Sequence, residues 1–163
     1  QLQYIIGKEN FDNTLKRYFD DWSFKHPKPN DFIRSAEKVS GLELDWYLLD
    51  WAQSTMTIDY SVNSIYGVDN KTRIVLKRIG QMGMPIDLRV KLKSGETLDY
   101  NIPMTKMRGS KPLQSSTLLK SWSWAKPYYE VWLDVDSKNI SKITIDPKNE
   151  MADINRDNNY LVL

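Results

Sequence analysis

The sequence predicts an α+β protein, in which a helical segment over residues 1–54 precedes an antiparallel, immunoglobulin-like β-sandwich over residues 55–163. Two observations lead to this prediction. Up to about residue 53, apolar residues recur every three or four positions, as on one face of a helix. From Thr57 onward they alternate with polar residues, as on one face of a strand. Several short strands separated by turns are typical of two packed sheets, and we expect six or seven of them here.

The helical segment divides into about three helices with short polar links. The first covers residues 11–22. The second covers residues 30–40, with Asn30 as the expected N-cap and Gly41 as the residue that ends it in the left-handed conformation. The third covers residues 44–51, and its expected solvent face carries Glu43, Asp45 and Asp50.

Residues 1–6 look like the end of a helix that Gly7 stops, so we expect the chain to be a piece of a longer protein. We expect the strands within residues 55–163. In that part, residues 103–124 show no regular spacing of apolar residues and are not assigned to a strand. The predicted strands are 57–62, 72–79, 86–92, 98–102, 129–135 and 143–145, with 160–163 as the seventh if it pairs.

Composition excludes several classes of function. The 23 basic and 21 acidic residues give a net charge of +2, so no broad positive field is available to attract nucleic acid. Cysteine is absent, which excludes disulfides and thiolate zinc sites. No long apolar run is present, so we expect no membrane span.

The segment from Lys25 to Trp51 contains Lys25-His26-Pro27, Asp31-Phe32, Ser40-Gly41 and Leu44-Asp45-Trp46 in this order and ends at Trp51. This pattern closely resembles the end of the catalytic domain in the membrane-alanyl-aminopeptidase family of gluzincin zinc metallopeptidases, in particular bacterial, Bacteroidetes-type members. Shorter stretches in the second part, such as Gly83-Met84-Pro85-Ile86, are similar to the small β-sandwich that follows it in that family. The matching residues that we interpret as structural are His26, Pro27, Pro29, Asp31, Phe32, Ser40, Gly41, Leu44, Asp45, Trp46 and Trp51.

The resemblance implies a non-catalytic C-terminal region that supports the catalytic domain of a zinc aminopeptidase. Catalysis in the family needs a zinc held by a His-Glu-x-x-His pair and a further Glu, and this chain has one histidine, so no catalytic residue is carried over. Zinc would belong to the parent protein, and no cofactor is expected here. The implied partners are the upstream catalytic domain of the same chain and, for the parent, peptides that lose their N-terminal residues. A periplasmic or secreted location is then favoured over a cytoplasmic one.

An alternative is an independent module that binds glycans or proteins. Trp122, Trp124, Tyr128 and Trp132 are the residues that could stack on a sugar ring if they lie exposed on one face. The same aromatics could instead fill the edge of the core.

A weaker candidate site is a calcium loop near the end of the chain. Its alternating oxygen donors would be Asp153, Asn155, Asp157 and Asn159. The sixth position of such a loop is Asn158 rather than glycine, and no glutamate follows at the twelfth. Turns in which these side chains bond their own backbone are therefore the simpler explanation of the pattern.

Overall fold

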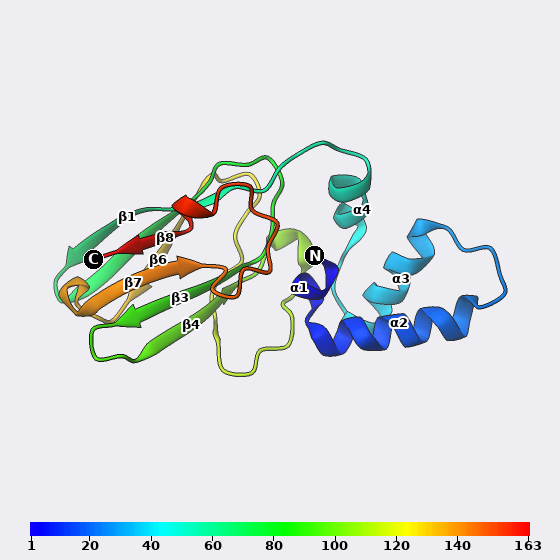
Figure 1. Ribbon diagram of the computed structural model, residues 1–163, viewed down its shortest axis with the longest axis horizontal. Helices are drawn as coiled ribbons and strands as arrows, with labels where there is room; N and C mark the ends of the chain where they lie inside the picture. The colour runs from blue at the N-terminus through cyan, green and yellow to red at the C-terminus, as the bar shows by residue number, and fades with distance from the viewer.

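The computed structural model, which describes residues 1–163, has helices at one end of an elongated molecule and β-strands at the other (Figure 1). The helical segment contains four helices rather than about three, because Gly7, at a φ of 84°, separates a short first helix from the second. The helices are α1 (Leu2–Ile6), α2 (Lys8–Trp22), α3 (Pro29–Ser40) and α4 (Asp45–Ala52).

Helix α3 has Lys28 as its N-cap, two residues before Asn30, so the prediction of Asn30 as its N-cap is wrong. Pro29 is the first helical residue, a position where the missing N–H of proline costs nothing. The backbone N–H of Lys28 donates to the Asp31 carboxylate at 2.8 Å, which holds the start of the helix. The predicted end is confirmed, since Gly41 is left-handed at a φ of 72°.

Helix α4 is buried on more than one side, because Tyr47, Leu48 and Trp51 also pack half-buried against the core. Leu44, which precedes it, is fully buried, but so are Trp46 and Asp50, which lie one turn apart on the same side. Asp50 was expected on the solvent face and is only 5 % exposed, whereas Leu49 is 57 % exposed. The most deeply buried side of α4 is therefore the one that carries Trp46 and Asp50.

Eight strands form two sheets. One has the order β1-β2-β6 and the other the order β5-β4-β3-β7-β8. All pairs are antiparallel except β4 with β5, which is parallel. The count exceeds the expected six or seven because the two-residue β5 forms within the stretch that showed no period. The strands are β1 (Tyr60–Val68), β2 (Lys71–Arg78), β3 (Ile86–Leu92), β4 (Thr97–Ile102), β5 (Thr117–Leu118), β6 (Tyr128–Leu133), β7 (Ile140–Ile145) and β8 (Tyr160–Val162).

Helices α1, α3 and α4 and both sheets contribute to one hydrophobic core of 29 buried residues. Alternate residues of β3, such as Leu88 and Val90, enter it from one sheet, and Ile74 and Leu76 of β2 enter it from the other. Helix α1 lies at the junction of the two parts (Figure 1) and is buried on nearly all sides. The boundary near residue 54 thus separates two kinds of secondary structure but not two cores.

A hydrogen-bond network holds α1 against the start of β3. The Tyr4 hydroxyl donates to the Pro85 carbonyl and accepts from the Asp87 N–H, both at 3.1 Å. Lys111 Nζ lies 2.6 Å from the Asp87 carboxylate and 4.4 Å from the centre of the Tyr4 ring. Burial raises the pKa of Tyr4 well above its ordinary value, so its hydroxyl stays protonated and able to donate.

Candidate functional site

Three segments that are far apart in the sequence meet around a shallow hollow of about 380 Å³, which we call the Trp124 hollow. The Glu43 N–H donates to the Met107 carbonyl at 3.0 Å, which joins the start of α4 to the 3₁₀ turn η1 (Thr105–Met107). The Thr105 N–H donates to the Trp122 carbonyl at 3.1 Å, which joins η1 to the third segment. The hollow is lined by Glu43, Asp45, Trp46, Thr105, Lys106, Arg108 and Trp124.

Trp124 stands on a tightly anchored turn. The turn is closed by a hydrogen bond of 3.0 Å from the Lys126 N–H to the Ser123 carbonyl. The Trp122 indole donates to the Lys126 carbonyl at 2.8 Å, and the Arg78 guanidinium donates to the Trp124 carbonyl. The Trp124 side chain nevertheless remains 56 % exposed, so a rigid backbone presents an accessible indole ring.

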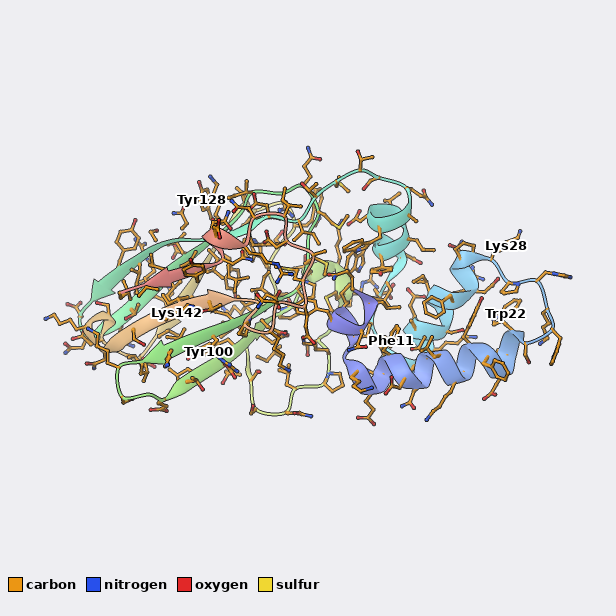
Figure 2. The ribbon with its side chains drawn as sticks, in the orientation of Figure 1. Phe11, Trp22, Lys28, Tyr100, Tyr128 and Lys142 are labelled. Carbon is orange, nitrogen blue, oxygen red and sulfur yellow. The ribbon has the colours of Figure 1, made fainter.

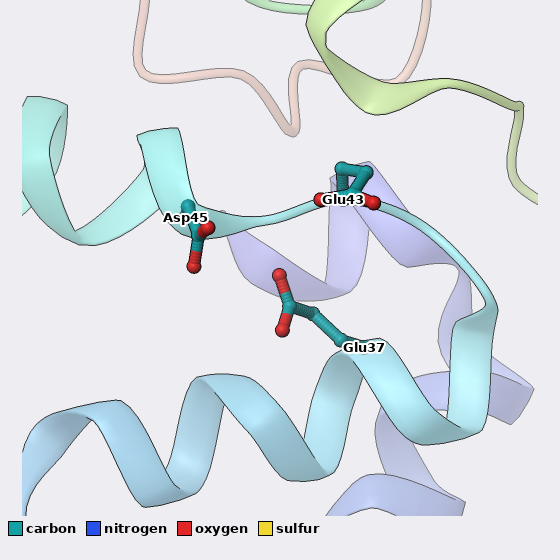
Figure 3. A group of neighbouring side chains, drawn as sticks. All are labelled: Glu37, Glu43 and Asp45. Atoms are coloured by element: carbon teal, nitrogen blue, oxygen red, sulfur yellow. The ribbon is translucent and has the colours of Figure 1, made fainter.

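Three acidic side chains gather at the start of α4 (Figure 3), and two of them, Glu43 and Asp45, line the hollow. Glu37 points from α3 toward the segment that carries Glu43 and Asp45, and oxygens of the three lie within 4.8 Å of one another. Glu37 Oε1 accepts the Leu44 N–H at 2.8 Å, and Glu43 lies 3.7 Å from Arg108. These bonds, together with the favourable position of a carboxylate in the first turn of a helix, account for the cluster without a metal ion.

The basic residues of the loop around η1 contact partners within the chain. Lys106 Nζ lies 5.1 Å from the centre of the Trp124 ring. Arg108 ends η1 in the left-handed conformation, at a φ of 51°, and reaches Glu43. Lys111 is paired with Asp87. These cations therefore do not converge on one site for an anion.

The four aromatic residues predicted as a sugar-binding group are separated by the fold. Trp122 is 5 % exposed and packs against Tyr60 and Tyr129 in the core, with ring centres at 5.4 Å and 5.2 Å. Tyr128 and Trp132, 49 % and 53 % exposed, alternate with the buried residues of β6 and lie on the outer face of its sheet (Figure 2 labels Tyr128). Only Trp124 lines the hollow.

The residues of the family-like segment lie mainly in structural positions. His26 and Pro27 are exposed in the link before α3, and the Phe32 ring packs edge-on against Tyr18 at 5.1 Å. The Ser40 hydroxyl donates to the Ala36 carbonyl at 2.7 Å at the end of α3.

The second half of that segment leads from Gly41 to α4. Leu44 and Trp46 are buried, and the Trp46 indole donates to the Glu43 carbonyl at 2.9 Å. Trp51 is half-buried and lies 5.9 Å from the Tyr47 ring. Asp45 is exposed, and with Trp46 it lines the Trp124 hollow, a position that no sequence pattern predicted.

The calcium candidates do not point to a common centre. Asp153 is buried, and its two oxygens accept the N–H groups of Tyr60 at 2.9 Å and Asn155 at 2.8 Å. With its amide oriented so that the nitrogen faces Asp153, Asn159 donates to the same carboxylate at 3.1 Å. Asn155 and Asp157 are exposed. Burial raises the pKa of Asp153. The geometry favours turns held by backbone hydrogen bonds.

A second cleft, of about 330 Å³, lies between α1, β3, β4 and the loop after Gly109. Four of its charged side chains form two pairs. Arg89 forms two hydrogen bonds to Asp99, at 2.7 Å and 2.8 Å, and Lys111 contacts Asp87. The bonds from Arg89 lower the pKa of Asp99. Neither pair includes Lys148 or Glu150, which also line this cleft.

The apolar side of the helical hairpin formed by α2 and α3 is poorly covered. In the 15 residues of α2 only Thr14 is buried. Phe19 is 67 % exposed, Leu15 is 46 % exposed, and Phe24 in the following link is fully exposed. Figure 2 shows Phe11 near the junction with the sheets and Trp22 at the far end of α2. The hairpin therefore projects an apolar surface away from the core.

None of the helices combines the length and the hydropathy needed to cross a bilayer. Comparison of the chain with protein-family models and with curated proteins finds no match.

Proposed function

We propose that this chain is the non-catalytic C-terminal region of a zinc aminopeptidase-like protein, in which the helices dock on the catalytic domain and the sheets support it. The zinc and the peptide substrate belong to that catalytic domain. The resemblance of the segment from Lys25 to Trp51 to the gluzincin family motivates the assignment.

The observation that carries the proposal is the uncovered face of α2. A surface helix normally buries its apolar stripe, and the exposed side chains of Leu15, Phe19 and Phe24 mark a contact surface. The stripe lies beside the family-like segment, because α2 packs on α3. The end of a catalytic domain is where such a contact is expected.

We also propose that the two sheets form an immunoglobulin-like sandwich. The shared core and the mainly antiparallel pairing support this interpretation. The parallel pair of β4 and β5 is a departure from that pattern.

The first experiment tests whether the chain belongs to a zinc aminopeptidase. The reading frame upstream of the Gln1 codon is searched for His-Glu-x-x-His and a later Glu, and the encoded segment is co-expressed with the chain. The expected result is a complex that contains zinc and releases p-nitroaniline from aminoacyl-p-nitroanilides, whereas the chain alone does neither. An upstream frame without the zinc motif, or turnover that co-elutes with the chain alone, contradicts the proposal.

The second experiment tests the docking face. In the double variant Phe19→Ser, Phe24→Ser, we expect the complex with the upstream segment to weaken by at least tenfold, roughly the effect of losing a hydrophobic hot spot. Val162→Ser is the matched control, since Val162 is 65 % exposed on β8, at the opposite end of the molecule. An equal loss in the control, or no loss in the double variant, would show that α2 is not the docking face.

A further inference from the structure

We infer that the Trp124 hollow is a binding site for neutral carbohydrate. The inference does not depend on the docking face of α2, because the two surfaces share no residue. It rests on three features of the hollow: an exposed aromatic ring, polar groups of both charges beside it, and anchored backbone on all sides.

The exposed ring provides the apolar contact. The face of an indole is weakly negative, and the C–H groups on one side of a pyranose are weakly positive, so the two stack. Trp124 is 56 % exposed and opens into the hollow, whereas Trp46, which also lines it, is 7 % exposed and serves as its wall. One sugar ring can therefore lie against Trp124.

The polar lining matches hydroxyl groups. Glu43 and Asp45 are acceptors, Lys106 and Arg108 are donors, and Thr105 can do both. Each hydroxyl of a sugar can donate one hydrogen bond and accept others. Adjacent hydroxyls can therefore bond the carboxylate acceptors and the cationic donors of the lining at the same time.

The charge balance of the lining argues for a neutral ligand. Two carboxylates and two cations line the hollow, so their formal charges cancel. A cationic ligand would compete with Lys106 for the face of Trp124 and be repelled by it. An anionic ligand would meet the carboxylates of Glu43 and Asp45, and the nearby carboxylate of Glu37 adds to the negative charge on that side. A neutral polyhydroxyl ligand is repelled by neither set of charges, and of the two obstacles it meets only the competition with Lys106 for the face of Trp124.

The anchored segments lower the cost of binding. The turn that carries Trp124 is held by the Trp122 indole, and the segment that carries Glu43 is held by Met107 and Trp46. Since little backbone has to be ordered when a ligand arrives, more of the contact energy remains as affinity.

The outer face of β6 is the other place where a sugar could stack on an exposed tryptophan, and Trp132 on that face therefore serves as the control residue. Trp132 is 53 % exposed, close to the value for Trp124. Its neighbours differ, because Arg73 lies over both the Trp132 and Tyr66 rings, at 5.9 Å and 4.6 Å, and Trp132 lines neither the Trp124 hollow nor the second cleft.

The test is affinity electrophoresis of the 163-residue chain in gels that contain soluble xylan, mixed-linkage β-glucan, galactomannan or amylopectin. We expect at least one of these neutral polysaccharides to retard the protein. Trp124→Ala and Asp45→Asn should each weaken the retardation by at least about tenfold, the loss typical of a central binding residue. Trp132→Ala should leave it unchanged. Circular dichroism of each variant checks that it is folded.

A second readout locates the site independently of the variants' mobility. The six tryptophans give separate indole N–H signals in a ¹H–¹⁵N spectrum, and the Trp124 signal is assigned by its loss in Trp124→Phe. Titration with oligosaccharides of the retarding polymer should shift that signal and leave the Trp132 signal in place. The inference is overturned if no polysaccharide retards the protein, or if retardation survives in Trp124→Ala and is lost in Trp132→Ala.

Discussion

Tyr60 illustrates how one buried side chain joins distant backbone. It begins β1, is 2 % exposed, and its hydroxyl donates to the Met84 carbonyl at 3.2 Å and accepts the Met84 N–H at 2.8 Å. Met84 lies in the loop before β3, so a single phenol ties the two sheets together. Burial raises the pKa of Tyr60 to about 12, chiefly because the charged form loses its hydration.

Replacing Tyr60 by Phe should destabilise the protein by about 2 kcal/mol at pH 7, because both polar groups of Met84 would remain buried without a partner. Unfolding in guanidinium chloride, followed by circular dichroism, measures the change. Tyr128→Phe is the control, since Tyr128 is 49 % exposed. A loss below about 0.5 kcal/mol would mean that water or another group replaces the hydroxyl.

The raised pKa of Tyr60 also predicts how stability depends on pH. Between pH 10 and 12 the unfolded chain releases this proton while the folded chain keeps it, so the contribution of Tyr60 to the free energy of unfolding falls as pH rises. The full shift corresponds to about 3 kcal/mol. In Tyr60→Phe, the free energy of unfolding should fall less steeply with pH over this interval than in the unsubstituted chain. A residual slope should remain because the pKa of Tyr4 is also raised. Equal slopes would contradict the assignment.

Helix α1 shows at the scale of one element why the helical segment does not separate from the sheets. A helix of five residues is too short to be stable alone. It forms here because Leu2, Ile5 and Ile6 are almost completely buried between the two parts of the molecule. Tertiary packing, rather than helix propensity, accounts for its presence.

We therefore expect Ile5→Ala to reduce the free energy of unfolding by about 2–5 kcal/mol, through lost burial and the cavity that remains. Gln3→Ala on the same helix is the matched control, because Gln3 is exposed, and its effect should stay within about 0.5 kcal/mol. Chemical unfolding gives both values. If the two variants have similar stability, α1 does not contribute to the core in the way that its burial indicates.

The whole molecule combines a firmly packed body with a weakly covered extension. The sheets, α1 and parts of α3 and α4 share one core, whereas α2 buries only Thr14. Regions with few buried apolar contacts open at a lower free energy than the core. The extension is also where the exposed side chains Leu15, Phe19 and Phe24 lie, so the least protected part of the chain is the part proposed to dock.

Amide hydrogen exchange should reveal this gradient. In a dilute solution of the chain alone, we expect the amides of α2 to exchange through local opening, well before those of α1 and β3. Adding the upstream segment should slow exchange in α2 if docking occurs there. Equal protection of α2 and β3 in the isolated chain would contradict the proposed gradient in packing.

What the sequence determined by itself was local. The change of apolar period near Thr57 correctly predicted helices followed by strands, and the left-handed end at Gly41 was confirmed, because both depend on backbone geometry within a few residues. The two-residue β5 was missed because it exists only through its parallel pairing with β4.

What only the tertiary structure decided was which side chains meet. Trp124 was predicted as a ligand-binding residue together with Trp122, Tyr128 and Trp132. Packing buries Trp122, however, and places Tyr128 and Trp132 on another face of the molecule. The actual neighbours of Trp124 include Asp45, predicted as structural, and Lys106 and Arg108, which no pattern connected with it. The hollow depends on hydrogen bonds between distant segments, and local periodicity carries no information about such contacts.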